Sequence, residues 1–267
     1  MKFTVSGHIR HERDDAPAAI RTLREIRTEA GPLAEISGRA YSGAMTDLSS
    51  WTKRPSPGGD MLAGGRVRLE PLDWAQHGEG LFAAVGGNAN ADIWTWMPVG
   101  PFAEPGAMEQ FLLEWAHDKD GWRTMVIRAA GIGEVLGMAS YMRIREAHGS
   151  AEIGCVAFGP KLKRTPEATE ALALMAGHVF DLGYRRYEWK CNNGNLASKR
   201  AAERFGFVFE GIFRNDMVVK GVSRDTAWYS ITDAEWPTRR VALGHWLADD
   251  NFAKDGCQKR TLESFRA

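Results

Sequence analysis

The chain has 267 residues, which is enough for one large domain with extensions or for two small domains. Hydrophobic residues make up 44 % and charged residues 25 %, so the composition excludes a fibrous or wholly disordered chain. Basic and acidic residues are balanced at 34 each. Nucleic-acid binding needs a basic excess, so we expect no nucleic-acid partner and favour a small or neutral one.

Apolar runs and cysteine spacing indicate where the protein is located in the cell and whether it binds a metal. No apolar run approaches the roughly 18 residues of a membrane span, so no membrane association is predicted. Cys155, Cys191 and Cys257 lie far apart without a CxxC or Cys/His ligand spacing, which predicts neither a metal site nor a disulfide framework. The N-terminus is too polar and acidic for a secretory signal. We therefore expect a cytoplasmic protein without a bound metal.

Residues 1–60 are predicted to form an N-terminal extension and linker. A short alternating piece and one modest helix precede the turn-rich stretch SSWTKRPSPGGDMLAGG. One helix buries little apolar surface, and Met45 offers a second start. We expect residues 1–44 to be dispensable for activity.

Regular patterns begin at Arg66. The segment VRLEPL predicts a strand, and Trp74–Val85 predicts a helix that ends at a pair of glycines. The aromatic, proline-broken segment ADIWTWMPVGPF predicts a loop. A second helix is predicted over EPGAMEQFLLEWAHD, and one apolar face of it carries Met108, Phe111, Leu112 and Trp115.

The remaining elements predict a domain at residues 61–236. Three strands, WRTMVIR, EVLGMASYMRI and AEIGCVAF, precede a helix from Pro166, the strand RRYEWKC, a helix from Leu196, and the strand segments FVFEGIFR, DMVVK and TAWYSIT. The order β-α-α-β-β-β-α-β-α-β-β predicts an α+β (mixed α/β) fold with a central, mixed, mostly antiparallel sheet flanked by helices. Residues 237–267 predict a C-terminal helix and tail, which either packs on the domain or forms a homodimer contact.

The stretch RTPEATEA, which links the strand AEIGCVAF to the next helix, admits two interpretations. The first turn of a helix has N–H groups without internal partners, and these bind anions. Lys161, Lys163 and Arg164 would add positive charge to such a cradle. Alternatively, Thr165 simply caps a helix that has Glu167 and Glu170 near its start.

These motifs carry a resemblance to a known family. The element order, with RTPEATEALAL and NLASKRAAERFGF, resembles the GNAT superfamily of acyl-CoA-dependent N-acyltransferases. The pattern AEIG…P…ATEA…N-x-x-S…GF-x-x-EG most resembles its RimJ/RimL-like branch, from about Arg66 to Trp236. The resemblance implies an enzyme that moves an acetyl group from acetyl-CoA to a primary amine, either a protein N-terminus or a small amine, by direct attack.

Two departures from the family pattern keep an alternative open. Pro166 stands where the family's loop has its first glycine, and Ala202 stands where many members have a tyrosine acid. Proline suits the first helical position because the helix does not use that N–H. The alternative function is a non-catalytic acyl-CoA-binding or interaction module.

The resemblance also implies roles for residues of both motifs. The loop is expected to hold the diphosphate of CoA, Asn195 to contact its pantetheine arm, and Ser198 to contact the thiol. From the residues alone, Asn195 is also a typical helix cap. The implied cofactor-binding set is Lys163, Arg164, Thr165, Pro166, Glu167, Ala168, Thr169, Asn195 and Ser198.

Glu152 is the candidate general base, with Ser198 as the second candidate catalytic residue. Resembling enzymes often place a carboxylate on the strand before the loop, and an alkylammonium with a pKa of about 10 needs such a base at neutral pH. The alternative is that Glu152 forms a surface charge pair with Arg143 or Arg145 on the neighbouring strand.

The same strand contains Cys155 and a glycine. Strand alternation places Glu152, Gly154 and Val156 on one face and Cys155 on the other. Gly154 marks a candidate bulge that would splay the strand. An acyl-cysteine mechanism at Cys155 is not expected, because no histidine of these motifs is placed to activate the thiol.

Aromatic residues predict the acceptor pocket. In the superfamily the segment IWTWMPVGPF would close over the acceptor, and aromatic rings favour a cation or an apolar group. Core packing is the alternative, since the chain has ten tryptophans. The candidate substrate-binding residues are Trp94, Trp96, Met97, Phe102, Tyr141 and Trp189.

Overall fold

The structure, a computed structural model, describes residues 46–266. A compact unit begins at Trp51, and the fold below is that of this unit. The extension predicted at residues 1–44 lies outside the described residues. Over residues 46–266, no helix has the length and apolar character needed to cross a membrane.

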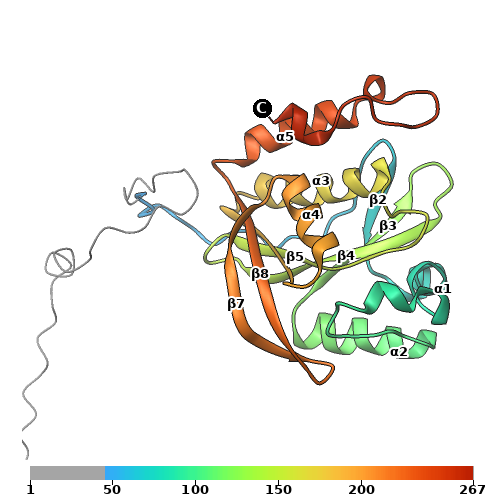
Figure 1. The fold of residues 1–267 in the computed structure, drawn as a ribbon. Coiled ribbons are helices and arrows are strands. Elements are labelled where there is room, and N and C mark those ends of the chain that lie inside the picture. The colour runs from blue at the N-terminus through green and yellow to red at the C-terminus, as the bar shows by residue number, and fades with distance from the viewer. Residues whose placement is uncertain (1–45, 267) are drawn as a thin grey trace, which may run out of the picture. The chain divides into compact units, whose positions relative to one another are not determined.

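An eight-stranded sheet runs through the unit in the order β1-β2-β3-β4-β5-β6-β8-β7 (Figure 1). Only β5 (Ser150–Phe158) and β6 (Arg186–Asn192) are parallel neighbours, and all other pairs are antiparallel. The predicted mixed, mostly antiparallel sheet is thus confirmed. The other strands are β1 (Leu62–Ala63), β2 (Val67–Pro71), β3 (Arg123–Ala129), β4 (Val135–Arg145), β7 (Val208–Val219) and β8 (Val222–Thr232).

Helices cover both faces of the sheet (Figure 1). On one face, α3 (Pro166–Asp181), α4 (Leu196–Phe205) and α5 (Trp236–Leu247) pack into one apolar core with residues of β5 and β6. On the other face, α1 (Trp74–Val85) and α2 (Pro105–Gln110) enclose a second core. Because α5 contributes buried residues to the first core, the C-terminal helix packs on its own domain.

The second predicted helix changes its form at Phe111. It continues as a π-helix, η3 (Phe111–Lys119), whose wider turn rotates the side chains that follow. Leu112 and Ala116 are buried, whereas Trp115 is 54 % exposed. The apolar face predicted for this segment thus includes an exposed ring at Trp115, because the 3.6-residue period applies only to an α-helix.

Glu170 fastens α3 to the start of β2. Its carboxylate accepts hydrogen bonds from the backbone N–H groups of Gly65 (3.1 Å), Arg66 (2.7 Å) and Val67 (2.8 Å). The side chain is buried, so water does not replace these bonds easily. This residue of the acidic helix start therefore has a structural role.

Replacement of Glu170 by alanine is expected to lower the free energy of unfolding by about 3 kcal/mol, because three backbone donors lose a charged acceptor. Urea denaturation followed by circular dichroism measures the change. Glu167→Ala, in the first turn of the same helix, is the control and should cost about 0.5 kcal/mol. Equal losses in the two variants would contradict the assignment.

Candidate active site

The parallel strands β5 and β6 separate halfway along their length. They pair from Ser150 with Arg186 to Ile153 with Trp189, and the pairing stops there. Beyond Ile153, the side of β5 that faces β6 has no strand partner among the described residues. This opening exposes backbone groups between two strands that would otherwise be hydrogen-bonded to each other.

A bulge in β5 accompanies the separation. Ser140 of β4 lies opposite Gly154, whereas Met138 lies opposite Ala157, so β5 carries one residue more than β4. Cys155 sits within the bulge with a φ of 46°. The bulge predicted at Gly154 is confirmed.

The bulge changes which faces the next side chains occupy. Cys155 packs against the core beneath α1, and Val156 packs against the core beneath α3. This is the reverse of the predicted alternation, because one extra residue inverts the order of faces. Burial raises the pKa of the Cys155 thiol to about 12, which keeps it protonated and unreactive at neutral pH.

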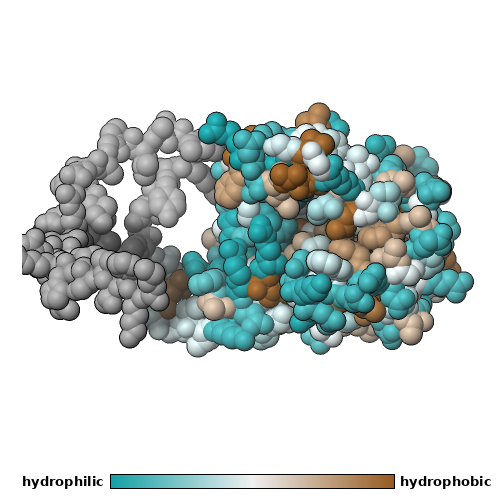
Figure 2. All heavy atoms as spheres, turned by 90° about the horizontal axis from the view of Figure 1, so that it is seen from below, coloured by the Kyte–Doolittle hydropathy of each residue, from teal (hydrophilic) through white to brown (hydrophobic). Residues whose placement is uncertain are grey.

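A cavity of about 1520 Å³ opens where the two strands part. Its wall includes the bulge, the N-terminal ends of α3 and α4, the loop before α2, η3, and parts of β7 and β8. Figure 2 views the unit from the side of α1 and α2, and hydrophobic residues gather toward the middle of this face within a hydrophilic surround. Apolar side chains such as Trp96 and Met97 line the cavity together with charged ones such as Glu152.

The N-terminal end of α3 is both capped and open to the cavity. Thr165 Oγ1 accepts a hydrogen bond from the N–H of Ala168 at 3.2 Å, so the capping interpretation is confirmed. Lys161 turns away and pairs with Glu134 at 2.6 Å. Of the predicted loop set, Glu167 does not line the cavity, whereas Lys163, Arg164, Thr165, Pro166, Ala168 and Thr169 do.

The second predicted motif reaches the same cavity from α4. Asn195 Oδ1 accepts from the N–H of Ser198 at 3.1 Å and caps the helix. Ser198 Oγ accepts from Trp189 Nε1 at 3.0 Å, and all three residues line the cavity. Burial raises the pKa of the neighbouring Cys191 thiol, and a hydrogen bond from the Ser198 hydroxyl opposes this rise, so the hydroxyl hydrogen has the thiol as a partner.

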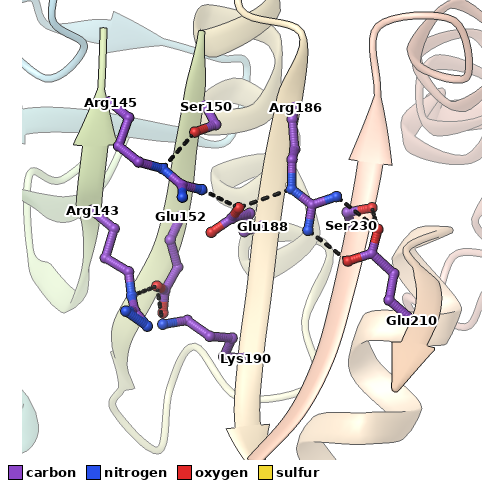
Figure 3. Close-up of polar contacts among 9 residues, drawn as sticks. All are labelled: Arg143, Arg145, Ser150, Glu152, Arg186, Glu188, Lys190, Glu210 and Ser230. Atoms are coloured by element: carbon purple, nitrogen blue, oxygen red, sulfur yellow. Dashed lines mark hydrogen bonds and ion pairs between the residues drawn. The ribbon is translucent and has the colours of Figure 1, made fainter. Parts of the chain in front are cut away.

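Glu152 lies on β5 just before the strands separate, and it is 4 % exposed. Its Oε2 lies 2.6 Å from Lys190 Nζ and 3.1 Å from Arg143 Nε, and all three residues line the cavity (Figure 3). Burial raises the pKa of the Glu152 carboxyl above its ordinary value, although the two cations oppose this. Burial likewise lowers the pKa of Lys190.

A second buried carboxylate, Glu188 on β6, lies beside Glu152 in the strand register. It forms ion pairs with Arg145 and with Arg186, whose Nε lies 2.8 Å away (Figure 3). Arg186 continues the network to Glu210. Glu188 does not line the cavity, so of these two neighbouring carboxylates only Glu152 faces it.

The predicted acceptor residues divide into two groups. Trp96, Met97 and Trp189 line the cavity. The other three, Trp94, Phe102 and Tyr141, lie in the core, so the prediction for them is corrected. Trp94 Nε1 donates to the carbonyl of Val85 at 2.8 Å, and Phe102 packs edge-on against Trp94. The Tyr141 hydroxyl donates to the carbonyl of Met175 at 3.1 Å.

Several cavity residues escaped the sequence interpretation. Lys190 follows Glu188 by two positions in RRYEWKC, so strand alternation could have placed both on one face. Arg204 donates to Thr169 Oγ1 at 3.2 Å and lies over the ring of Trp246, 4.7 Å from its centre. Further cavity residues that no sequence pattern indicated include Trp115, Arg224, Thr226, Phe252 and Gln258.

Comparisons with known proteins agree with this geometry. The sequence profile described as "Acetyltransferase (GNAT) domain" matches residues 66–208. A crystal structure of a GCN5-related N-acetyltransferase from Brucella melitensis is 47 % identical, with a TM-score of 0.78, and the match covers 82 % of this chain and 99 % of that one. No curated protein matches the chain.

Two further solved structures are similar. A protein from Chromobacterium violaceum described as a "probable" acetyltransferase of the GNAT family is 37 % identical, with a TM-score of 0.69, over 78 % of this chain and all (100 %) of that one. Spermidine N-acetyltransferase from Vibrio cholerae, solved with CoA and spermine, is 18 % identical, with a TM-score of 0.54, over 65 % of this chain and 99 % of that one, and it shows the fold alone.

The predicted fold and the predicted enzyme class are both confirmed by these matches. The profile spans the strand pair β5 and β6, the bulge, and the N-terminal ends of α3 and α4. The chain belongs to the GNAT acetyltransferase family.

Proposed function

We propose that this acetyltransferase binds acetyl-CoA with the diphosphate at the N-terminal end of α3 and the thioester between β5 and β6. The observation that carries the proposal is the separation of the two strands after Ile153 and Trp189. Because of this separation, the N-terminal end of α3 and a buried carboxylate, Glu152, line one cavity.

The residues at the α3 end suit a diphosphate. The first-turn N–H groups carry a partial positive charge of about half a unit, and Arg164 adds a full charge beside them. Lys163 adds another cation, whose Nζ lies 3.4 Å from Asp92 on the same cavity wall. Arg204 brings a further cation to Thr169 in the first turn of the helix. The replacement of the family's glycine by Pro166 removes a donor that the helix does not use internally.

Glu152 is proposed as the general base. Its carboxylate takes one proton from the acceptor ammonium, directly or through water, and the free amine bonds to the acyl carbon. As the carbon–sulfur bond breaks, the second proton of the nitrogen passes to the departing thiolate, which leaves a neutral amide and the free thiol. Lys190 and Arg143 hold the carboxylate in place. Ser198 is proposed to turn its hydroxyl hydrogen toward the departing thiolate, while its oxygen still accepts from Trp189. N–H groups of the bulge are placed to stabilise charge on the carbonyl oxygen.

The RimJ/RimL-like branch is proposed on the N-x-x-S motif. Asn195 and Ser198 both line the cavity, and they come from the first turn of one helix. Members of the resembling branch imply a small amine or a protein N-terminus as the acceptor. The exposed rings of Trp96 and Trp115 beside the cavity suit either acceptor.

The test is an assay of thiol release from acetyl-CoA across a panel of amines, together with calorimetric titration of CoA. We expect CoA to bind and at least one amine to be acetylated. The acetylated product is identified by mass spectrometry. A protein that folds but binds no CoA would overturn the proposal.

A further inference from the structure

Two polar side chains of β8 project into the cavity beyond the end of β6. The pairing of β6 with β8 ends at Asn192 and Thr226, and Arg224 lies two residues further along β8. Both Arg224 and Thr226 line the cavity. Arg224 is 8 % exposed and Thr226 is 1 % exposed, so each is largely removed from bulk water.

Neither side chain has the partner that its burial requires. Arg224 Nε and Thr226 Oγ1 are buried without a hydrogen-bond partner, and among residues 46–266 Arg224 forms no ion pair. Its neighbour Asp225 points elsewhere, since its Oδ1 accepts from the N–H of Asn215 at 2.7 Å. A buried guanidinium without a counterion is costly, and a bound anion would remove that cost.

The other partly buried cations of the cavity are engaged. Lys190 and Arg143 share the carboxylate of Glu152. Arg204 donates to Thr169 at the α3 end. Arg224 therefore differs from them because, among the described residues, its side chain has neither an ion pair nor a hydrogen-bond partner.

Arg224 lies on the acceptor side of the cavity. The residues proposed to hold acetyl-CoA come from β5, α3 and α4, whereas Arg224 and Thr226 come from β8. Trp228, on the same face of β8, has Lys190 4.6 Å from its ring centre, so this strand also runs beside the ion pairs of Glu152. At about 3.3 Å per residue, Thr226 and Arg224 lie roughly 7 and 13 Å along the strand from Trp228.

We propose that Arg224, assisted by Thr226, binds a carboxylate of the acceptor, so that the preferred acceptor is a primary amine that also carries a carboxylate. The proposal rests on the proposed function and narrows it. A carboxylate matches one unpaired guanidinium in charge, and the planar fork of Nε and Nη binds it through two hydrogen bonds. The Thr226 hydroxyl supplies a third donor.

The test compares ω-amino acids of increasing chain length with their primary amides. Each pair keeps the amine and the shape of the chain but differs in the negative charge. At the best chain length, we expect kcat/KM for the acid to exceed that for the amide by about 30-fold, the ratio expected for one hydrogen-bonded charge pair. Titration of the same compounds into the CoA complex should show the same order of affinity.

Variants of Arg224 test whether this residue causes the preference for the acid over the amide. Arg224→Gln should lower kcat/KM for the acid by about 30-fold and remove the difference between acid and amide. Arg224→Lys keeps the charge without the fork and should give an intermediate ratio. Arg214→Gln, an exposed arginine of β7 outside the cavity, is the matched control and should leave the ratio unchanged.

Each outcome separates this inference from the proposed function. An enzyme that acetylates amides as well as acids, or an Arg224→Gln variant that keeps the preference, overturns the carboxylate site alone. An equal loss for acid and amide, with a lower melting temperature, would show that Arg224 is structural and would also overturn it. Failure to bind CoA overturns the proposed function instead.

Discussion

Replacing Glu152 with glutamine is expected to lower kcat by about 100-fold or more, because a positioned general base contributes roughly two to four orders of magnitude. Glutamine keeps the size of the side chain but cannot accept the ammonium proton. The KM for acetyl-CoA should change little, since Glu152 lies on β5 and not at the α3 end. Steady-state thiol release measures both parameters.

The pH dependence of kcat/KM checks the same assignment. The base works only when it is deprotonated, so activity falls as pH decreases through the pKa of Glu152. Burial raises that pKa above the ordinary glutamate value of about 4.3, so the acidic limb of the profile should lie above it. In the glutamine variant this limb is lost and the rise in rate with pH flattens.

Glu188 provides the matched control. It is the register partner of Glu152, it is equally buried, and it also pairs with two cations, yet it does not line the cavity. Glu188→Gln should therefore reduce the melting temperature to a similar extent but keep the acidic limb. A Glu152→Gln enzyme with an unchanged pH profile would refute the base assignment, and loss of the limb in both variants would indicate a structural effect.

The double variant Lys163→Glu and Arg164→Glu is expected to raise the KM for acetyl-CoA by about 100-fold or more. Two positive charges at the α3 end become negative beside a diphosphate, and each reversal costs about 1–2 kcal/mol at a partly exposed site. Arg164 has a φ of 65°, and glutamate bears the same backbone cost as arginine there. Calorimetric titration of CoA checks the affinity independently of turnover.

Lys161→Glu is the control for this loop. Lys161 is exposed and basic like its neighbours, but it pairs with Glu134 and does not line the cavity. We expect its effect on KM to be a few-fold at most, through long-range charge alone. If charge reversal at Lys161, Lys163 and Arg164 raises the KM for acetyl-CoA equally, the effect comes from the net charge of the loop, and the proposed contact with the diphosphate is contradicted.

Sequence patterns predicted the helix bounds correctly where neighbouring residues cap the helix. The predicted bounds of α1, Trp74–Val85, hold because Asp73 caps its start and Gly86 ends it. Thr165 and Asn195 likewise cap α3 and α4, which fixes both helix starts at the cavity. The residues proposed for acetyl-CoA follow from these caps, which explains why the sequence located them.

Sequence patterns could not predict which side chains meet across the sheet. Lys190 contacts Glu152 only because β5 and β6 are parallel neighbours. The register of these two strands depends on how α3, which connects them in the chain, packs against the sheet. Trp94 and Trp96 stand two positions apart in an aromatic loop, and only the fold decides that the first is buried and the second exposed. Arg224 carries no motif at all, and its significance lies in the missing partner.

The family profile ends at residue 208, whereas the cavity wall continues through β7 and β8 to the loop after α5. The residues proposed to hold acetyl-CoA lie inside the region that the profile matches, whereas Arg224 and Thr226, proposed to bind the acceptor, lie in β8 beyond it. Under the two proposals, a substitution in β8 would alter the choice of amine and leave the residues that hold acetyl-CoA unchanged.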